Sequence, residues 1–250
     1  MAIRLKNGSE FLHIPKTGGT SVHKVLSDLN LIEDEKGQKH TNYDLGLYID
    51  RLGTGRILLK LLFRMLFKKF FSTPSWTNKR LRFCFVRNPL AWYESWFKYM
   101  SQIGWPNWGK VNSIYNWHPC IELNGLGSDS FNSFIENVLS KRPGFLTSLY
   151  HSYTRDGIDF IGKTEYLNTH LYYILNNIGI NFYSSETNVI PNMNASYQCA
   201  NPVKWDPDLM NAVKMTEMSA FLHYDYFSKE EKEFYLSSQA DCTHPKLIIT

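Results

Sequence analysis

The sequence predicts an α/β fold in which a mostly parallel sheet is flanked by helices. Three segments, at residues 9–29, 82–100 and 158–178, each carry a short apolar run followed by apolar residues at helical spacing. Strands that alternate with helices in this way imply a parallel sheet with helices on both of its faces. The length of 250 residues and the hydrophobic content of 43% suit a single domain, 1–250, without an internal repeat.

The first unit begins with an apolar run that contains Phe11, Leu12 and Ile14. A Gly-Gly turn follows, and then a helix is indicated by apolar residues at helical spacing, namely Val22, Val25, Leu26 and Leu29. Residues 33–44 are polar, and we expect them to form a loop with one short strand near 39–41.

Residues 56–71 predict a basic amphipathic helix. Arg56, Lys60, Arg64 and Lys68 recur every four residues through an otherwise apolar segment, which gives a narrow basic stripe beside a wide apolar face. Such a helix either covers the core as a lid, forms a dimer contact, or lies peripherally on an anionic membrane surface. The sequence leaves these alternatives open, and with them the oligomeric state.

The second unit is a buried strand at 82–86 that runs directly into Asn88 and Pro89. Asn88 suits the N-cap and Pro89 the first position of a helix, which we expect to continue to about Met100. Residues 101–130 then form an excursion rich in Trp, Gly and Asn. It is too long for an ordinary connection, so we expect it to have a function.

The C-terminal half predicts a short helix at 131–139, a strand at 158–162, a helix at 168–178 and a last strand at 187–190. Asp206 as N-cap and Pro207 then open a final helix. Its apolar residues are Leu209, Met210, Val213, Met218 and Leu222.

Charge and cysteine content limit the partners and the compartment. The net charge of +4 is mild and predicts no nucleic-acid partner, because such proteins carry a dense basic patch. The cysteines, which have no CxxC or zinc-like spacing, predict free thiols in a reducing compartment; they are Cys84, Cys120, Cys199 and Cys242. No signal peptide and no transmembrane run is recognised, so we expect a cytoplasmic protein.

The most informative segment is residues 13–21, His-Ile-Pro-Lys-Thr-Gly-Gly-Thr-Ser, between the first strand and the first helix. Free backbone N–H groups and the positive end of the helix dipole meet at such a turn, which therefore binds an anion. Gly18 and Gly19 allow close approach of the backbone, and Lys16 adds a mobile charge. This is no Walker A loop, because the lysine precedes both glycines. Hydroxyl donors come from Thr17, Thr20 and Ser21.

A second charged turn follows the strand at 82–86, where Arg87 stands at the strand end and Ser95 lies on the next helix. The planar guanidinium of arginine is suited to phosphate. The carboxyl ends of parallel strands meet at one edge of a sheet, so one ligand with two anionic groups could bridge both turns.

Both segments resemble the PAPS-dependent carbohydrate sulfotransferases, a group that includes the heparan sulfate 2-O-sulfotransferase-like and bacterial enzymes. Residues 13–21 are similar to the family's 5′-phosphosulfate-binding loop, and residues 83–96 (Phe-Cys-Phe-Val-Arg-Asn-Pro-Leu-Ala-Trp-Tyr-Glu-Ser-Trp) to its 3′-phosphate-binding block. Residues 160–165 and 191–196 resemble the family more weakly. The likeness covers most of the chain, but only the first two segments are specific.

The resemblance implies a P-loop-kinase-like three-layer sandwich and transfer of a sulfuryl group from 3′-phosphoadenosine 5′-phosphosulfate (PAPS), leaving adenosine 3′,5′-bisphosphate (PAP). It places Lys16 on the sulfonate and bridging oxygen, residues 17–21 around the 5′-phosphosulfate, and Arg87 and Ser95 on the 3′-phosphate. The family often has a basic residue after the block at 191–196, where this chain has Tyr197 and Gln198. No metal is needed if Lys16 neutralises the leaving group.

An alcohol acceptor also needs a general base, for which histidine has a suitable pKa. Of the eight histidines we favour His40, which follows a polar loop, and family relatives have a histidine in a similar place. His13 is the rival, although its position on the strand favours packing. His118 and His151 are further candidates on the acceptor side.

The resemblance implies a carbohydrate acceptor, and aromatic rings can bind the apolar faces of sugars. Trp105 and Trp108 lie in the Gly- and Pro-containing excursion and are the candidates for this contact, whereas Trp92 and Trp96 are four residues apart on a helix and suit the core. Two other functions stay open. One is a P-loop-type nucleotide-binding kinase, and the other is a non-catalytic module that binds glycans or a membrane surface.

Overall fold

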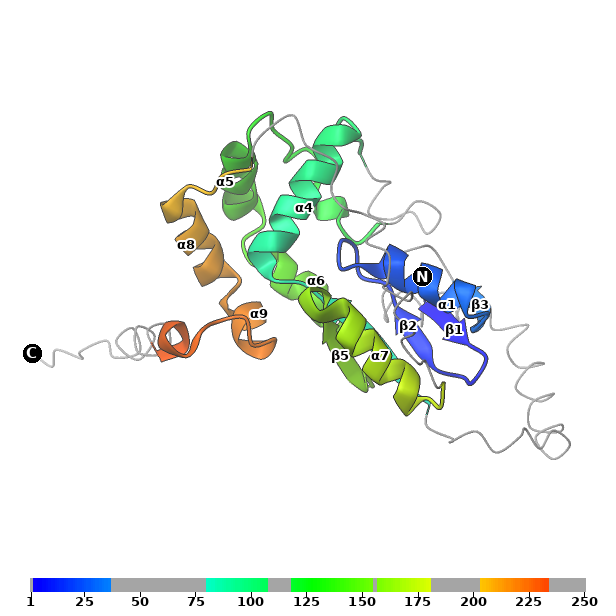
Figure 1. Cartoon of the computed structure of the whole chain (residues 1–250). Coiled ribbons are helices and arrows are strands. Elements are labelled where there is room, and N and C mark those ends of the chain that lie inside the picture. The colour runs from blue at the N-terminus through cyan, green and yellow to red at the C-terminus, as the bar shows by residue number, and fades with distance from the viewer. Residues whose placement is uncertain (1, 37–79, 108–117, 155–156, 181–202, 234–250) are drawn as a thin grey trace, which may run out of the picture.

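The computed structural model describes residues 2–36, 80–107, 118–154, 157–180 and 203–233. The centre of the fold is a five-stranded sheet with the order β3-β1-β2-β4-β5 (Figure 1). Its strands are β1 (Ala2–Leu5), β2 (Glu10–Leu12), β3 (Ile32–Lys36), β4 (Arg82–Val86) and β5 (Phe160–Lys163).

The sheet is mixed, with a parallel half that contains both charged turns. β4 pairs in parallel with β2 on one side and with β5 on the other. β1 runs antiparallel to both of its neighbours, β2 and β3. The expected α/β fold with a mostly parallel sheet is therefore confirmed at this level, and the antiparallel β1 is an addition that the sequence did not indicate.

The expectation of a polar loop from residue 33 onwards is wrong for its first residues, because Ile32–Lys36 form the edge strand β3. An edge strand tolerates charged side chains, since they can point to solvent and pair across the surface. Glu33 pairs with Arg4 at 3.2 Å, and Glu35 lies 2.6 Å from Nε2 of His23. The charges that suggested a loop thus belong to a solvent-facing strand.

Helices lie on both faces of the sheet. Alternate strand residues divide the core into two parts, because successive side chains of a strand point to opposite faces. Phe11, Phe83 and Phe85 pack with residues of α1 and α7, and Leu12, Cys84 and Val86 pack with residues of α4, α5 and α6. These helices are α1 (Gly19–Asp28), α4 (Pro89–Gln102), α5 (Phe131–Lys141), α6 (Phe145–Thr154) and α7 (Leu167–Asn177).

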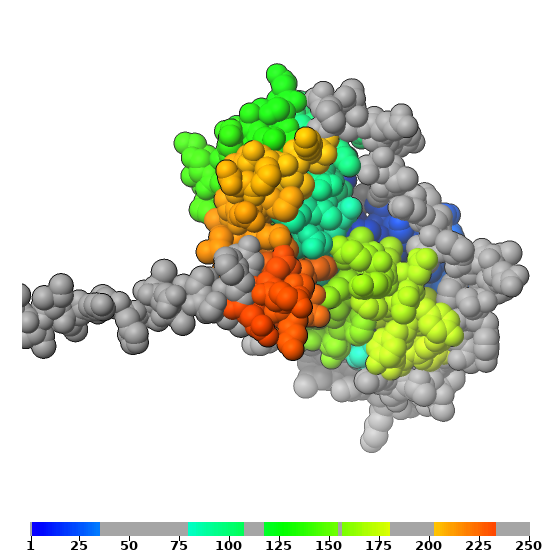
Figure 2. Space-filling view, turned by 60° about the vertical axis from the view of Figure 1, so that its left-hand side comes forward, coloured from blue at the N-terminus to red at the C-terminus, as the bar shows by residue number. Residues whose placement is uncertain are grey.

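Two further helices, α8 (Pro207–Thr216) and α9 (Met218–His223), follow near the C-terminal end. α8 packs against α4 and α5, as the gold and green surfaces of Figure 2 show, and α9 contacts α6. A single helix was expected here, and that expectation is wrong, because the helix is interrupted at Glu217, between α8 and α9. This residue is only 1% exposed, and its carboxylate turns into the protein.

The local helix signals are otherwise confirmed. The Asn88 side chain accepts a hydrogen bond from the amide of Leu90 at the start of α4, and Asp206 caps α8 in the same manner, with a proline next in both cases. The strand predicted at 158–162 starts two residues later than expected, at Phe160. α6 was not predicted, although Phe145, Leu146, Leu149, Tyr150 and Tyr153 follow helical spacing and are buried.

Several expectations concern residues outside the described ranges: the strands at 39–41 and 187–190 and the basic helix at 56–71. In the part of the chain that the structure describes, no helix is long and apolar enough to cross a membrane.

Candidate active site

The loop between β2 and α1 places its backbone in unusual conformations. Lys16 has a φ of 64° and Gly18 a φ of 80°, both in the left-handed region. A non-glycine residue there is uncommon and persists where its surroundings hold it. The Thr17 hydroxyl donates to the carbonyl of Ile14 at 3.0 Å, and Thr17 is fully buried. The Thr17 side chain therefore fixes the loop, and its hydroxyl is not directed to a ligand.

Gly19 is required by the close approach of His13. A Cβ atom at Gly19 would lie 1.8 Å from Cδ2 and 2.1 Å from Nε2 of the His13 ring. The ring is itself only 3% exposed and stacks on Phe11, with 6.0 Å between the ring centroids. His13 therefore packs beneath the loop, which is the role that its place next to the strand favoured over that of a base.

The first turn of α1 leaves donors at the loop. The amides of Ser21 and Val22 donate back to the carbonyl of Gly18, at 3.0 and 3.2 Å. The amides of Gly19 and Thr20 precede them and make no backbone hydrogen bond within the described residues, as is usual at a helix N-terminus. Ser21 is buried, whereas Thr20 is half-buried and accessible.

The Lys16 ammonium lies over an aromatic ring of α4. Its Nζ is 4.3 Å from the centroid of the Tyr99 ring, a cation–π contact with α4. The positive charge of Lys16 also lowers the pKa of Cys120, although burial raises that pKa more strongly. Lys16, Tyr99 and Cys120 thus come together from three separate segments of the chain.

The second charged turn lies next to the first. The Arg87 Nη1 donates to the carbonyl of Lys16 at 3.4 Å, a long hydrogen bond between the ends of β4 and β2. The indole Nε1 of Trp92, on α4, also donates to this loop, to the carbonyl of Pro15 at 2.8 Å. The two turns are therefore joined by two contacts, one of them from the helix that follows Arg87.

The backbone of residues 86–88 is held by side chains from elsewhere. The buried Tyr150 hydroxyl accepts from the amide of Arg87 at 3.1 Å and donates to its carbonyl at 2.7 Å. Thr164 donates to the carbonyl of Val86 at 2.9 Å, and Glu165 accepts from the amide of Asn88 at 2.7 Å. Sequence reasoning missed these roles of Tyr150, Thr164 and Glu165, because each side chain bonds to backbone atoms of a distant segment.

The remaining candidates on α4 differ in exposure. Ser95 lies about two turns along α4 from Arg87 and is half-buried. Trp92 and Trp96 are buried and stack with 5.4 Å between ring centroids and an interplanar angle of 6°. These two tryptophans belong to the core, as their spacing indicated.

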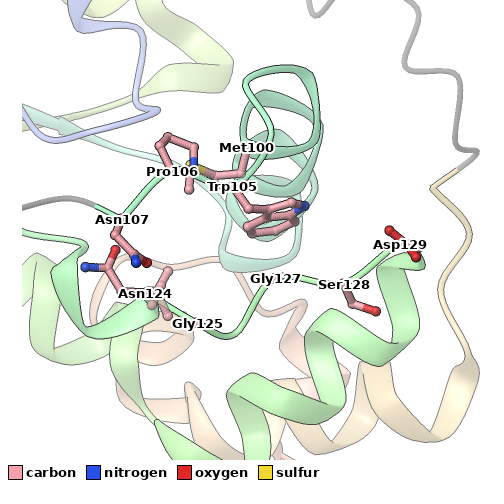
Figure 3. Close-up of a pocket in the computed structure, with 10 residues that line it drawn as sticks. Met100, Trp105, Pro106, Asn107, Asn124, Gly125, Gly127, Ser128 and Asp129 are labelled. Atoms are coloured by element: carbon pink, nitrogen blue, oxygen red, sulfur yellow. The ribbon is translucent and has the colours of Figure 1, made fainter.

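Trp105 lines a surface pocket beside the C-terminal end of α4. Its ring is half-buried against Phe97 and Phe134, at centroid distances of 5.8 and 5.3 Å, and Trp105 has a φ of 51°. A Cβ atom at Gly127 would lie 2.4 Å from the ring, so the indole rests on that backbone. Figure 3 shows the indole beside a rim with amide, hydroxyl and carboxylate groups; the polar lining residues are Asn107, Asn124, Ser128 and Asp129.

The surroundings of His118 favour the neutral form of its ring. Its Nδ1 accepts from the amide of Cys120 at 3.1 Å, which leaves the ring proton on Nε2. Burial lowers the pKa of His118 to about 4. A ring held in this tautomer offers a donor at Nε2, so His118 is a poor general base and a better hydrogen-bond donor.

The other predicted site residues, His40 and Trp108, lie outside the described residues, as does the segment 191–198. Within the described residues, no group of three or more His, Cys, Asp or Glu side chains is arranged to hold a metal ion. Comparison of the chain with family models, curated proteins and solved structures gave no match.

Proposed function

We propose that the protein is a sulfotransferase that moves a sulfuryl group from PAPS to a hydroxyl of a carbohydrate. The observation that carries the proposal is the contact between the two charged turns, in which Arg87 Nη1 donates to the carbonyl of Lys16 at 3.4 Å. Two cation-bearing turns at adjacent strand ends suit one ligand with two separated anionic groups. PAPS has this arrangement, and the resemblance of residues 13–21 and 83–96 points to the same donor.

The residues of the loop fit a 5′-phosphosulfate by their chemistry. The amides of Gly19 and Thr20 and the dipole of α1 favour a negative charge. The Thr20 hydroxyl is accessible. Arg87 and Ser95 would hold the 3′-phosphate, with the guanidinium as the main donor.

Lys16 would supply the charge that the reaction needs. In an in-line displacement, the acceptor oxygen forms a bond to sulfur while the bond from sulfur to the bridging oxygen breaks, and charge builds up on that oxygen. The Lys16 ammonium, held over Tyr99 at 4.3 Å, would neutralise that charge. The acceptor proton would pass to a base, for which we retain His40.

The acceptor would enter beside the tryptophan-rich excursion. Trp105 and the polar rim of its pocket offer an apolar surface beside hydrogen-bonding groups, which suits a sugar ring. His118, as a neutral donor, could contact an acceptor hydroxyl or a sulfonate oxygen. Trp108 and the peripheral membrane contact through residues 56–71 remain predictions from the sequence.

Thermal melting with nucleotides tests the donor. PAP should raise the melting temperature by mass action, and ATP with Mg²⁺ should raise it less. The double variant Lys16→Ala/Arg87→Ala should lose the shift, whereas Lys24→Ala should keep it, because Lys24 forms a surface pair with Asp28 on α1 at 3.1 Å. A larger shift with ATP and Mg²⁺ would favour the nucleotide-binding kinase, and no shift with PAP would refute the proposal.

A separate experiment tests the base. His40→Ala should bind PAP as the wild type does and lose transfer of labelled sulfate to acceptors. His223→Ala is the matched control, because His223 is exposed at the end of α9, and it should retain transfer. Full activity of His40→Ala would assign the base elsewhere.

A further inference from the structure

The backbone of the Arg87 turn is fixed by two side chains that lie far away in the sequence. Tyr150, fully buried on α6, bridges both polar backbone groups of Arg87 with one hydroxyl, at 3.1 and 2.7 Å. Glu165 accepts from the next amide, that of Asn88, at 2.7 Å, and its other oxygen accepts from Tyr226 at 3.1 Å. The position of the guanidinium thus depends on groups that do not themselves face the nucleotide.

We propose that Tyr150 and Glu165 are positioning residues that give the donor site its preference for a 3′-phosphate, by holding the backbone of residues 87–88. The inference rests on the proposed function. A bidentate arginine contact needs its donors within a few tenths of an ångström of the anion. Loss of the Tyr150 hydroxyl would leave the amide and carbonyl of Arg87 without their bridge, so that this turn relaxes.

The alternative is that Tyr150 only satisfies buried backbone groups and stabilises the fold. A purely stabilising role predicts that loss of the Tyr150 hydroxyl changes the dissociation constants of all nucleotides by the same factor, or changes none of them. Positioning of Arg87 predicts a selective effect, because only ligands with a 3′-phosphate reach the guanidinium.

The test measures the dissociation constants of PAP and adenosine 5′-phosphate, which lacks the 3′-phosphate, by calorimetry. Tyr150→Phe should weaken PAP binding about tenfold, which corresponds to about 1.4 kcal/mol, and leave the binding of adenosine 5′-phosphate unchanged within twofold. Tyr153→Phe is the control, since it removes the hydroxyl of another fully buried tyrosine on α6. In an Arg87→Ala background, Tyr150→Phe should have no further effect on PAP.

Glu165 provides an independent test that does not disturb the core, because its side chain is exposed. Glu165→Gln keeps an oxygen for the amide of Asn88 and removes the charge, whereas Glu165→Ala removes both. We expect Glu165→Ala to bind PAP several-fold more weakly than Glu165→Gln, with equal binding of adenosine 5′-phosphate. If Tyr150→Phe does not fold, the comparison of Glu165→Ala with Glu165→Gln is sufficient to test the positioning role.

Two outcomes overturn the inference while the proposed function stands. One is that wild type binds PAP and Tyr150→Phe retains the full preference for the 3′-phosphate. The other is that both nucleotides weaken by the same factor. If the wild-type protein does not bind PAP, the proposed function fails and the inference with it.

Discussion

The Glu217→Ala variant should have a markedly lower melting temperature than the wild type. The Glu217 carboxylate is 1% exposed and accepts from the amides of Leu146 and Thr147 at 3.0 and 2.7 Å. It also accepts from the hydroxyls of Thr147 at 2.7 Å and Tyr93 at 2.6 Å. Glu217 therefore caps the N-terminus of α6 from a distant part of the chain, where the helix dipole favours its charge.

The expected cost follows from these four hydrogen bonds. A buried amide that loses its acceptor costs about 1–3 kcal/mol. The loss of an ordinary helix N-cap costs about 1 kcal/mol in total, which corresponds to the lower end of that range. The variant no longer buries a carboxylate, which offsets part of the loss. We expect a net decrease of about 3 kcal/mol in the free energy of unfolding, or about 6–12 °C in melting temperature for a chain of this size.

Urea denaturation at neutral pH, followed by circular dichroism, measures this change. Glu217→Gln retains one oxygen and should fall between the alanine variant and the wild type. Glu122→Ala is the control, because Glu122 is an exposed residue that pairs with Arg142 at 3.3 Å, and it should change stability by less than about 0.5 kcal/mol. A Glu217→Ala variant within about 1 kcal/mol of the wild type would refute the assigned role of the carboxylate.

Three further outcomes are expected. Gly19→Ala should abolish the PAP-induced melting shift and lower stability, because its Cβ would lie 1.8 Å from the buried His13 ring; a wild-type shift would show that the ring can move. Trp92→Phe removes the 2.8 Å bond to the carbonyl of Pro15 and should weaken PAP binding several-fold, and unchanged affinity would contradict a role in holding the loop. Burial lowers the pKa of His118 to about 4 from 6.5, so the unfolded chain takes up the proton first and stability falls as the pH drops from 6.5 towards 4. Between pH 8 and pH 5 the free energy of unfolding should fall by about 2 kcal/mol because of His118. Denaturation curves of His118→Gln should lack this decrease. An equal decrease in the variant would refute its assignment to His118.

The elements with strong local signals could be predicted from the sequence. Asn88-Pro89 and Asp206-Pro207 mark helix starts through the fixed φ of proline and a side-chain acceptor, and both are observed. The buried strand at 82–86 was evident from its continuous apolar run. By contrast, β1 and β3 are short and partly charged, and only their pairing partners make them strands.

The break between α8 and α9 had no local signal of its own. Glu217 is a good helix former, and the apolar residues on either side fit one continuous helix. The interruption places the carboxylate at the N-terminus of α6, 70 and 71 residues earlier in the chain. Tertiary hydrogen bonding therefore outweighed helix propensity, which is a weak preference for a single residue.

The candidate site divides in the same way between groups that can face a ligand and groups that hold them in place. That the turns with Lys16, the two glycines and Arg87 lie side by side could be predicted, because each turn follows the end of a strand in the sheet. The groups that hold them act on backbone atoms over separations of 77 residues for Trp92 and Pro15, 63 for Tyr150 and Arg87, and 77 for Glu165 and Asn88. A backbone amide or carbonyl is present at almost every residue, so such a bond leaves no mark on the identity of the residue that it holds. Variants chosen from sequence patterns alone would therefore change the groups that we propose to bind the donor, and would leave untouched the hydrogen bonds that hold the backbone of Lys16 and Arg87.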